Sequence, residues 1–307
     1  AACGIRATIG KCMMDAPHPD VPARLREATQ ASIRDSEALH RQWHGAASGR
    51  IRAAFAPRFA LSCTRDLLEA VAGLSSAHAA LVHTHAAEQR DEIAEVRALT
   101  GMANLEYFEA VGLASPRLCA AHCVWVDEPE LAVIERHDIK VAHCPGSNLK
   151  LGSGIAPVVE MLGRGICVSL GADGAACNNH LDMFGEMRLA ATLQAARHQP
   201  GALAARQALV MATRNGARTL GLDTEIGSIE AGKRADLILV ARDRPHLAPD
   251  ADAFSSIVYA ARPDDVRMTM VDGEILVRDF ASTRMDAAAV AAAALDQARA
   301  LAARAGL

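Results

Sequence analysis

The sequence has 307 residues, of which 51% are hydrophobic and 22% charged, and its formal net charge is −4 at pH 7. This composition is typical of a globular protein with a sizeable core and excludes a disordered, collagen-like or coiled-coil chain. Without a basic cluster we expect no nucleic-acid partner, and without an apolar run of roughly 18–20 residues we expect no membrane association.

The cysteines and the first residues indicate the cellular compartment. The 8 cysteines occur singly in apolar runs and form no CxxC pair, so a disulfide framework is not expected. The opening AACGIRATIG has no charged stretch followed by an apolar core, which argues against a signal peptide. We therefore expect a cytoplasmic protein.

Short β-prone runs alternate with amphipathic helical stretches along the first part of the chain. Repeated βα units of this kind predict a parallel sheet covered by helices, as in a (β/α)₈ barrel, although the sequence contains six units and not eight. The predicted helices include residues 22–45, 88–101 and 129–138. The predicted strands lie within residues 4–15, 51–59, 79–88, 118–123, 139–148 and 166–175.

The pattern changes after Asp173. Residues 181–198 and 202–222 are predicted helices, and the region that follows has short strands with an Asp272-Gly273 hairpin signal. A final Ala-rich stretch is predicted to be helical. We therefore divide the chain into a barrel domain (1–222), strands of a small β-domain (223–280) and a C-terminal helix (281–307).

Polar side chains capable of chemistry follow several predicted strands. His83 and His85 lie two residues apart in one strand and so face the same side, and neutral imidazole is a good zinc ligand. Glu88 comes three residues later, where a carboxylate could exchange protons with a metal-activated water. His122, His143 and Asp173 end three further strands.

Each of these residues alone is more often a packed core histidine, a helix-starting glutamate or a turn-forming aspartate. Their joint occurrence favours a functional role, because a barrel brings the carboxyl ends of all its strands together round one axis. The joint pattern predicts a metal-dependent active site at this end of the barrel.

The chain resembles the amidohydrolase superfamily, in its cytosine-deaminase-like branch. Four stretches carry the resemblance: HTHAAE (83–88), AAHC (120–123), HCPGSNLKLGSGIAPV (143–158) and LGADGAACNNHLDMFGEMRLA (170–190). Within that branch they are most similar to deaminases of S-adenosylhomocysteine, 5′-methylthioadenosine and 5′-deoxyadenosine. GSIEAGKRADLILV (227–240) resembles the β-sandwich domain of the superfamily.

The resemblance implies roles for the residues at the strand ends. His85 and Asp173 would be ligands of one Zn²⁺, or Fe²⁺, per subunit, and Asp173 would also accept a proton from the attacking water. Glu88 would contact a purine ring nitrogen as general acid and base, and His122 would hydrogen-bond the water or the tetrahedral centre. His143 and His83 would support these groups from behind. A small-molecule substrate and a homo-oligomer are further expectations.

Two departures from the family pattern keep alternatives open. The His-x-His pair of the family's first strand is absent, so we expect that the sequence covers barrel strands three to eight only. APRF (56–59) resembles guanine deaminases, and Arg58 would then contact a purine edge, with Lys11 and Arg24 near the tail of a larger substrate. A guanine or 8-oxoguanine aminohydrolase, an s-triazine aminohydrolase and an inactive truncated barrel acting as a scaffold are the alternatives.

Overall fold

A parallel sheet of six strands forms the centre of the molecule. The computed structural model describes residues 2–18, 21–249 and 252–306. The strands follow one another in sequence order, so that within the described residues β1 and β6 are the sheet edges. The predicted βα order and α/β fold class are thereby confirmed. The strands are β1 (Ala7–Met13), β2 (Ile51–Pro57), β3 (Val82–Ala86), β4 (Leu118–His122), β5 (Lys140–His143) and β6 (Val168–Leu170).

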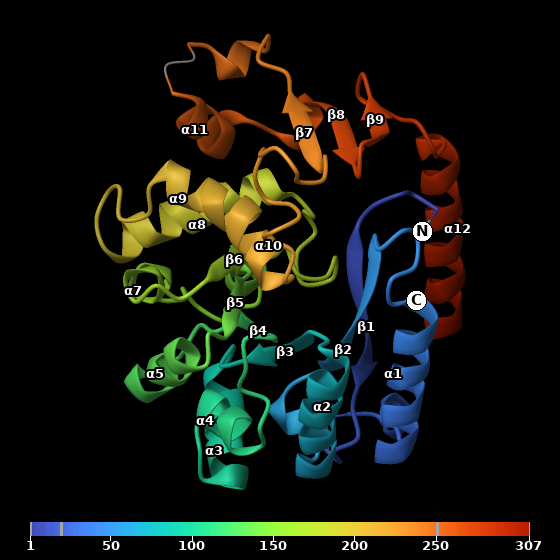
Figure 1. Ribbon diagram of the computed structural model, residues 1–307, viewed down its shortest axis with the longest axis vertical. Helices are drawn as coiled ribbons and strands as arrows, with labels where there is room; N and C mark the ends of the chain where they lie inside the picture. Colours follow the sequence, from blue (N-terminus) through green and yellow to red (C-terminus); the bar gives the residue numbers. More distant parts are fainter. Residues whose placement is uncertain (1, 19–20, 250–251, 307) are drawn as a thin grey trace.

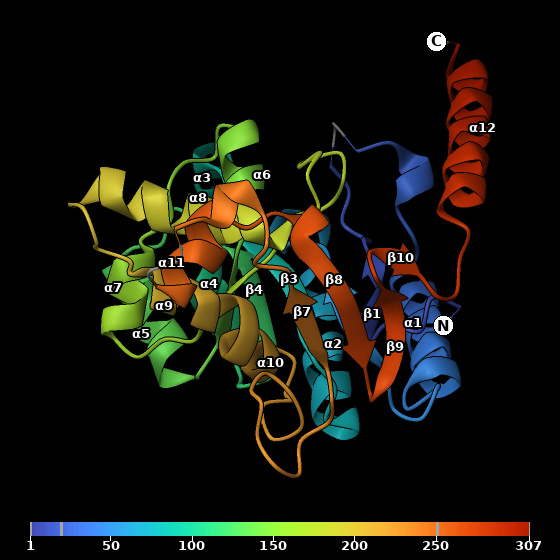
Figure 2. The same cartoon turned by 90° about the horizontal axis from the view of Figure 1, so that it is seen from above.

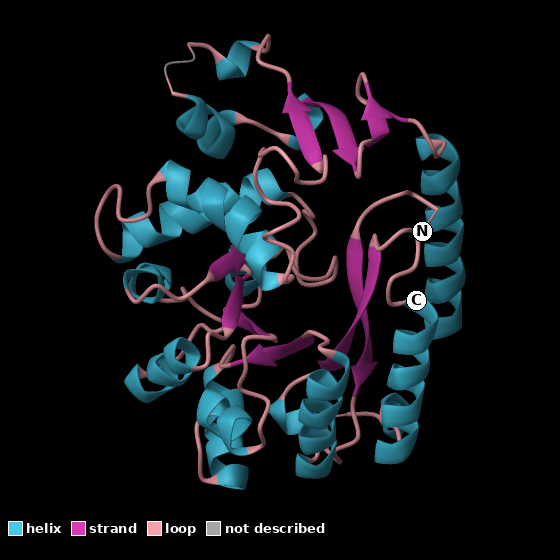
Figure 3. Ribbon diagram, in the orientation of Figure 1, coloured by secondary structure: helices cyan, strands magenta, loops and turns pink. Residues whose placement is uncertain are grey.

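Helices cover one face of this sheet, as Figure 1 and Figure 3 show. Aliphatic and aromatic side chains of strands and helices form a common core that includes Phe55 of β2, Leu67 of α2, Leu118 of β4 and Val141 of β5. The connecting helices are α1 (Thr29–Trp43), α2 (Arg65–His78), α3 (Arg90–Thr100), α4 (Asn104–Ala110), α5 (Glu128–Arg136), α6 (Pro145–Lys150) and α7 (Val158–Gly163).

The helix predicted over 22–45 begins later than expected. Residues at the start of α1 hydrogen-bond to the segment that follows β1 instead: the Glu27 N–H donates to the Met14 carbonyl at 2.9 Å, and the Thr29 hydroxyl donates to Asp15 at 2.6 Å. These contacts hold the chain away from helical geometry until Thr29. Only a short 3₁₀ turn, Ala23–Leu25, forms before it.

The second half of the chain forms helices and then a separate antiparallel sheet with the order β10-β9-β8-β7. Asp272 and Gly273 connect β8 to β9, and both have positive φ, as the predicted hairpin turn requires. The helices are α8 (Met183–Arg197), α9 (Ala205–Val210), α10 (Gly216–Thr219) and α11 (Ala253–Ser255). The strands are β7 (Leu237–Val240), β8 (Val266–Val271), β9 (Glu274–Arg278) and β10 (Ala281–Ser282).

The last helix, α12 (Ala287–Ala305), stands apart from the rest of the molecule, as Figure 2 shows. None of its residues is buried. Of the helices that the structure describes, none is both long and apolar enough to cross a membrane. The domain boundaries at residues 222 and 280 stay a prediction.

Candidate active site

Three histidine rings of β3 and β4 lie together toward the carboxyl ends of these strands. The centroids of His83 and His85 are 6.3 Å apart, and the ring of His85 stacks on that of His122 at 5.3 Å. The alternation of side chains along β3 puts His83 and His85 on one face, and the parallel register pairs His85 with Ala121, next to His122. Burial, chiefly, lowers the pKa of both His83 and His85, so both imidazoles are neutral near pH 7.

His122 ends β4 and is held from both sides. Its Nδ1 lies 2.9 Å from Oδ1 of Asn148, and its Nε2 lies 3.6 Å from Oε2 of Glu88. The side chain is 1% exposed. The backbone of His122 has a φ of 71°, which turns the chain away from the sheet directly after the strand.

Glu88 lies between β3 and α3, and its backbone is fixed by the buried Glu92. The Glu92 carboxylate accepts the N–H of Glu88 at 2.8 Å and that of Gln89 at 3.2 Å. It also accepts a hydrogen bond from the side chain of Asn104. Because an N3 glutamate satisfies free N–H groups at a helix start, Glu92 fixes the point from which Glu88 projects.

Asp173 follows β6 in a loop, with a φ of 58°. Burial alone would raise the pKa of its carboxyl, but hydrogen bonds from the Ser147 hydroxyl and the Gly174 N–H hold that pKa below its usual value. Both hydrogen bonds are 2.6 Å long. His122 and His85 also interact electrostatically with this carboxylate. Glu88, His122 and Asp173, which come from three different strand ends, therefore belong to one cluster.

The donors that a metal ion would need are present in part. Nδ1 of His85 lies 2.5 Å from the Arg58 carbonyl, and because a carbonyl only accepts, this contact leaves the Nε2 lone pair of a neutral ring available. Asp173 adds a carboxylate. Within the described residues, however, no group of three or more His, Cys, Asp or Glu side chains is arranged to hold a metal ion. These residues alone therefore do not complete a metal site.

The remaining predicted site residues are placed differently. Arg58 directly follows β2, and its guanidinium lies 5.0 Å from the centroid of the Phe59 ring. Lys11 on β1 forms an ion pair with Glu27. Arg24 lies on the exposed turn before α1 and has no hydrogen bond or ion pair to a described residue. Of the three, only Arg58 directly contacts the histidine cluster.

His143 is enclosed in the core at the end of β5. It is 1% exposed, and neither ring nitrogen has a hydrogen-bond partner among the described residues. Burial lowers the pKa of His143 to about 3. The ring is therefore neutral at physiological pH.

Sequence reasoning did not single out the residues that hold the cluster in place. Ser147, Asn148 and Ser153 contact Asp173, His122 and Glu88, respectively, and Glu92 accepts the backbone N–H of Glu88. The first three lie within the stretch 143–158 that carried the family resemblance, and their polar side chains were the available signal.

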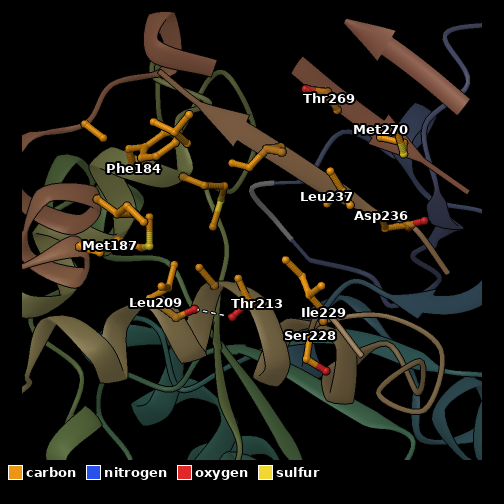
Figure 4. A pocket seen from close by; sticks show the side chains of 18 of the residues that line it. Phe184, Met187, Leu209, Thr213, Ser228, Ile229, Asp236, Leu237, Thr269 and Met270 are labelled. Carbon is orange, nitrogen blue, oxygen red and sulfur yellow. Dashed lines mark hydrogen bonds between the residues drawn. The ribbon is translucent and has the colours of Figure 1, made fainter. Parts of the chain in front are cut away.

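A large apolar cavity lies away from this cluster. Its volume is about 740 Å³, and none of the predicted site residues lines it. Figure 4 shows Phe184 and Met187 of α8 facing Leu237 of β7 across it. Residues of α8 and α9 and of the strands β7 and β8 line it.

A sequence profile of the amidohydrolase family matches residues 1–276. The chain belongs to the amidohydrolase family. The 5′-deoxyadenosine deaminase of Methanothermobacter thermautotrophicus is 42% identical to this amidohydrolase over 277 residues, which are 90% of this chain and 63% of that protein. The 5-methylthioadenosine/S-adenosylhomocysteine deaminase of Moorella thermoacetica is 44% identical over 254 residues, or 82% of this chain and 59% of that protein.

A solved structure agrees with the family assignment. The adenosine deaminase from Xanthomonas campestris with bound zinc has a TM-score of 0.89 and 33% identity, over 96% of this chain and 66% of that one. The amidohydrolase chain spans less than two thirds of the length of the two curated relatives.

Proposed function

We propose that this amidohydrolase contributes to the hydrolytic deamination of a purine nucleoside of the 5′-deoxyadenosine, 5′-methylthioadenosine or S-adenosylhomocysteine type. The convergence of Glu88, His122 and Asp173 at the carboxyl ends of the parallel strands carries the proposal. The 42% identity to a 5′-deoxyadenosine deaminase supports the substrate class.

The chemistry requires four proton transfers that these side chains suit. Water adds to the ring carbon that bears the amino group, and the C–N bond to that amino group then breaks. Glu88 carries a proton to the adjacent ring nitrogen, so that negative charge does not accumulate on the ring. Asp173 and His122 take up one proton of the attacking water and return it to the departing ammonia, and the hydroxyl proton of the adduct returns to Glu88 as the carbonyl forms.

A metal ion would activate the water in such a reaction. We propose zinc, or iron, at one ion per subunit, with His85 and Asp173 among its ligands. The neutral His85 ring with its available Nε2 and the ionised Asp173 carboxylate support this assignment. Because the described residues do not complete the site, the roles above concern proton transfer alone.

Arg58 supports guanine-type purines as a second candidate substrate class. Its guanidinium lies 5.0 Å from the centroid of the Phe59 ring, which is itself 6.3 Å from the His85 ring, and we propose that it donates to a purine oxygen. A guanine-type substrate would use such a donor, whereas a 6-aminopurine has no oxygen there. The cytoplasm and a homo-oligomeric state are further proposals, consistent with the family.

Assays of the purified protein on a substrate panel test the proposal. The panel contains 5′-deoxyadenosine, 5′-methylthioadenosine, S-adenosylhomocysteine, guanine and an amino-s-triazine, and ammonia release is measured. We expect release from the adenosine derivatives, and E88Q should lower it by about 100-fold or more. E69Q, on the exposed side of α2, is the matched control and should leave activity unchanged.

Each result has a defined meaning. Release from guanine or the triazine alone would move the assignment to that class. Absence of release from every compound, in protein that elemental mass spectrometry shows to contain about one metal ion per chain, would refute catalysis. Absence of both metal and activity would favour the scaffold alternative.

A further inference from the structure

One short segment contacts all three proposed acid–base side chains. We propose that the α6 segment, which we define as Pro145–Ser153, positions Glu88, His122 and Asp173 and determines which atoms of His122 and Glu88 carry protons. Its catalytic consequence rests on the proposed function, but its structural content does not. No comparison assigns a role to this segment.

The segment makes one hydrogen bond to each group. The Ser147 hydroxyl donates to Oδ2 of Asp173 at 2.6 Å. Oδ1 of Asn148 lies 2.9 Å from Nδ1 of His122. The Ser153 hydroxyl donates to Oε1 of Glu88 at 3.1 Å. Ser147 and Asn148 are 0% exposed and Ser153 is 1% exposed, so water does not compete for these contacts.

The Asn148 contact fixes the tautomer of His122. An amide oxygen can only accept, so Nδ1 of His122 carries the proton and the neutral ring keeps its lone pair at Nε2. That nitrogen is the one that faces Glu88. His122 can therefore accept a proton at the atom directed into the cluster.

Asn148 has no other evident hydrogen-bonding role. Its Nδ2 is buried and has no partner among the described residues. A buried asparagine that served only to stabilise the fold would have both ends of its amide satisfied. An apolar side chain would fill the same space without an unpaired N–H group, so the contact with His122 is what this residue supplies.

The Ser153 contact determines which oxygen of Glu88 is engaged. The Gln89 amide donates to the Ser153 hydroxyl oxygen at 2.7 Å, which directs the hydroxyl proton to Oε1 of Glu88. Oε1 is thereby occupied as an acceptor. When Glu88 is protonated, its proton is on Oε2, the oxygen that faces His122.

The α6 segment is itself anchored to the elements around it. The Gly146 N–H donates to Glu186 at 2.9 Å, and a Cβ at Gly146 would lie 2.5 Å from that same carboxylate. Lys150 donates to the Ala176 carbonyl at 2.8 Å, and the Trp125 indole donates to the Ser153 carbonyl at 2.7 Å. The three hydrogen bonds therefore extend from a fixed frame.

NMR of the protein labelled with ¹⁵N-histidine tests the tautomer without an activity measurement. The His122 signals, identified by their loss in H122Q, should show the pattern of an Nδ1-protonated neutral ring. N148D, which keeps an acceptor oxygen, should retain that pattern, and N148L, which is similar in size, should change it to the Nε2-protonated form or a mixture. An Nε2-protonated ring in the wild type, or an unchanged pattern in folded N148L, would overturn the proposal.

Kinetics tests the consequence for catalysis. S147A, N148L and S153A should each lower kcat by about 10- to 100-fold with little change in KM, because misplaced acid–base groups slow the chemical step. N148D should recover part of the loss. S75A removes a buried serine whose hydroxyl donates to the Ala80 carbonyl at 2.7 Å, just before β3 and so at the opposite end of that strand from Glu88, and should keep wild-type kcat.

The two readouts separate this proposal from the proposed function. The expected tautomer in a protein without deaminase activity would refute the function and leave the positioning role intact. Wild-type kcat in S147A, N148L and S153A would refute the positioning role and leave the function intact.

Discussion

Glu92 offers a quantitative test of how the Glu88 corner is held. Its carboxylate accepts hydrogen bonds from the N–H groups of Glu88 and Gln89 and from the Asn104 side chain. E92A removes the acceptor of all three hydrogen bonds at once. Because each buried donor without a partner costs about 1 kcal/mol or more, the free energy of unfolding should fall by roughly 3–5 kcal/mol.

The matched control is E92Q. Burial raises the pKa of Glu92, so removing its charge also removes a desolvation cost. The buried Oδ1 of Asn104 has no partner among the described residues, and a rotation of the Asn104 amide by half a turn would let it accept from the side-chain amide that E92Q introduces. All three hydrogen bonds are then retained, and E92Q should cost less than about 1 kcal/mol.

Urea unfolding followed by circular dichroism measures both variants, with the midpoint and slope compared to wild type. The reasoning fails if E92A unfolds within about 1 kcal/mol of wild type. It also fails if E92Q is as unstable as E92A, since the charge and not the hydrogen-bond count would then be decisive.

Three further predictions use the same unfolding assay. R6A should lower the free energy of unfolding by about 3 kcal/mol, because it leaves the Asp236 carboxylate, which is 16% exposed, without the guanidinium 2.6 Å away. R65A, which breaks the exposed ion pair with Glu69, should lower it by less than about 1 kcal/mol, and equal losses would contradict this prediction. G154A should lower the free energy of unfolding by at least about 2 kcal/mol, since φ is 126° and a Cβ would lie 2.8 Å from Trp125. G152A, where a Cβ would meet open space, should lower it by about 1 kcal/mol, and the reverse order would refute this prediction. Unfolded His143 takes up a proton below about pH 6.5, but folded His143 does so only below about pH 3, so the free energy of unfolding decreases as the pH is lowered through that window. Between about pH 7.5 and about pH 5, H143L should therefore lose about 2 kcal/mol less stability than wild type. Parallel pH profiles of the two proteins would exclude this role.

Local sequence patterns were sufficient to predict the parallel sheet and the end of its strands at which the candidate site lies. The β-prone runs predicted all six parallel strands because each strand is a short apolar run that ends in polar residues. His85, His122 and Asp173 could be placed at one edge because parallel strands bring their carboxyl ends together. The start of α1 was wrong by seven residues because hydrogen bonds from Glu27 and Thr29 to distant residues override the local helical pattern.

The positioning contacts could not be predicted in this way. Ser147 and Asn148 each lie 26 residues from their partners, and Ser153 lies 65 residues from Glu88. Such contacts depend on how loops from different βα units pack, and no periodicity in the sequence reports that packing. The polar side chains of Ser147, Asn148 and Ser153 were themselves the local sign.

The backbone at the strand ends has a consequence for any attempt to make the protein more robust. Ala87, His122, Cys123 and Asp173 all have φ between 47° and 71°, a left-handed region that costs a residue with a side chain about 1 kcal/mol relative to glycine. Glycine would relax each of these corners. At His122 and Asp173 the same change would delete the proposed chemistry together with the hydrogen bonds of these side chains, so these two corners keep a strained backbone as a condition of their proposed role.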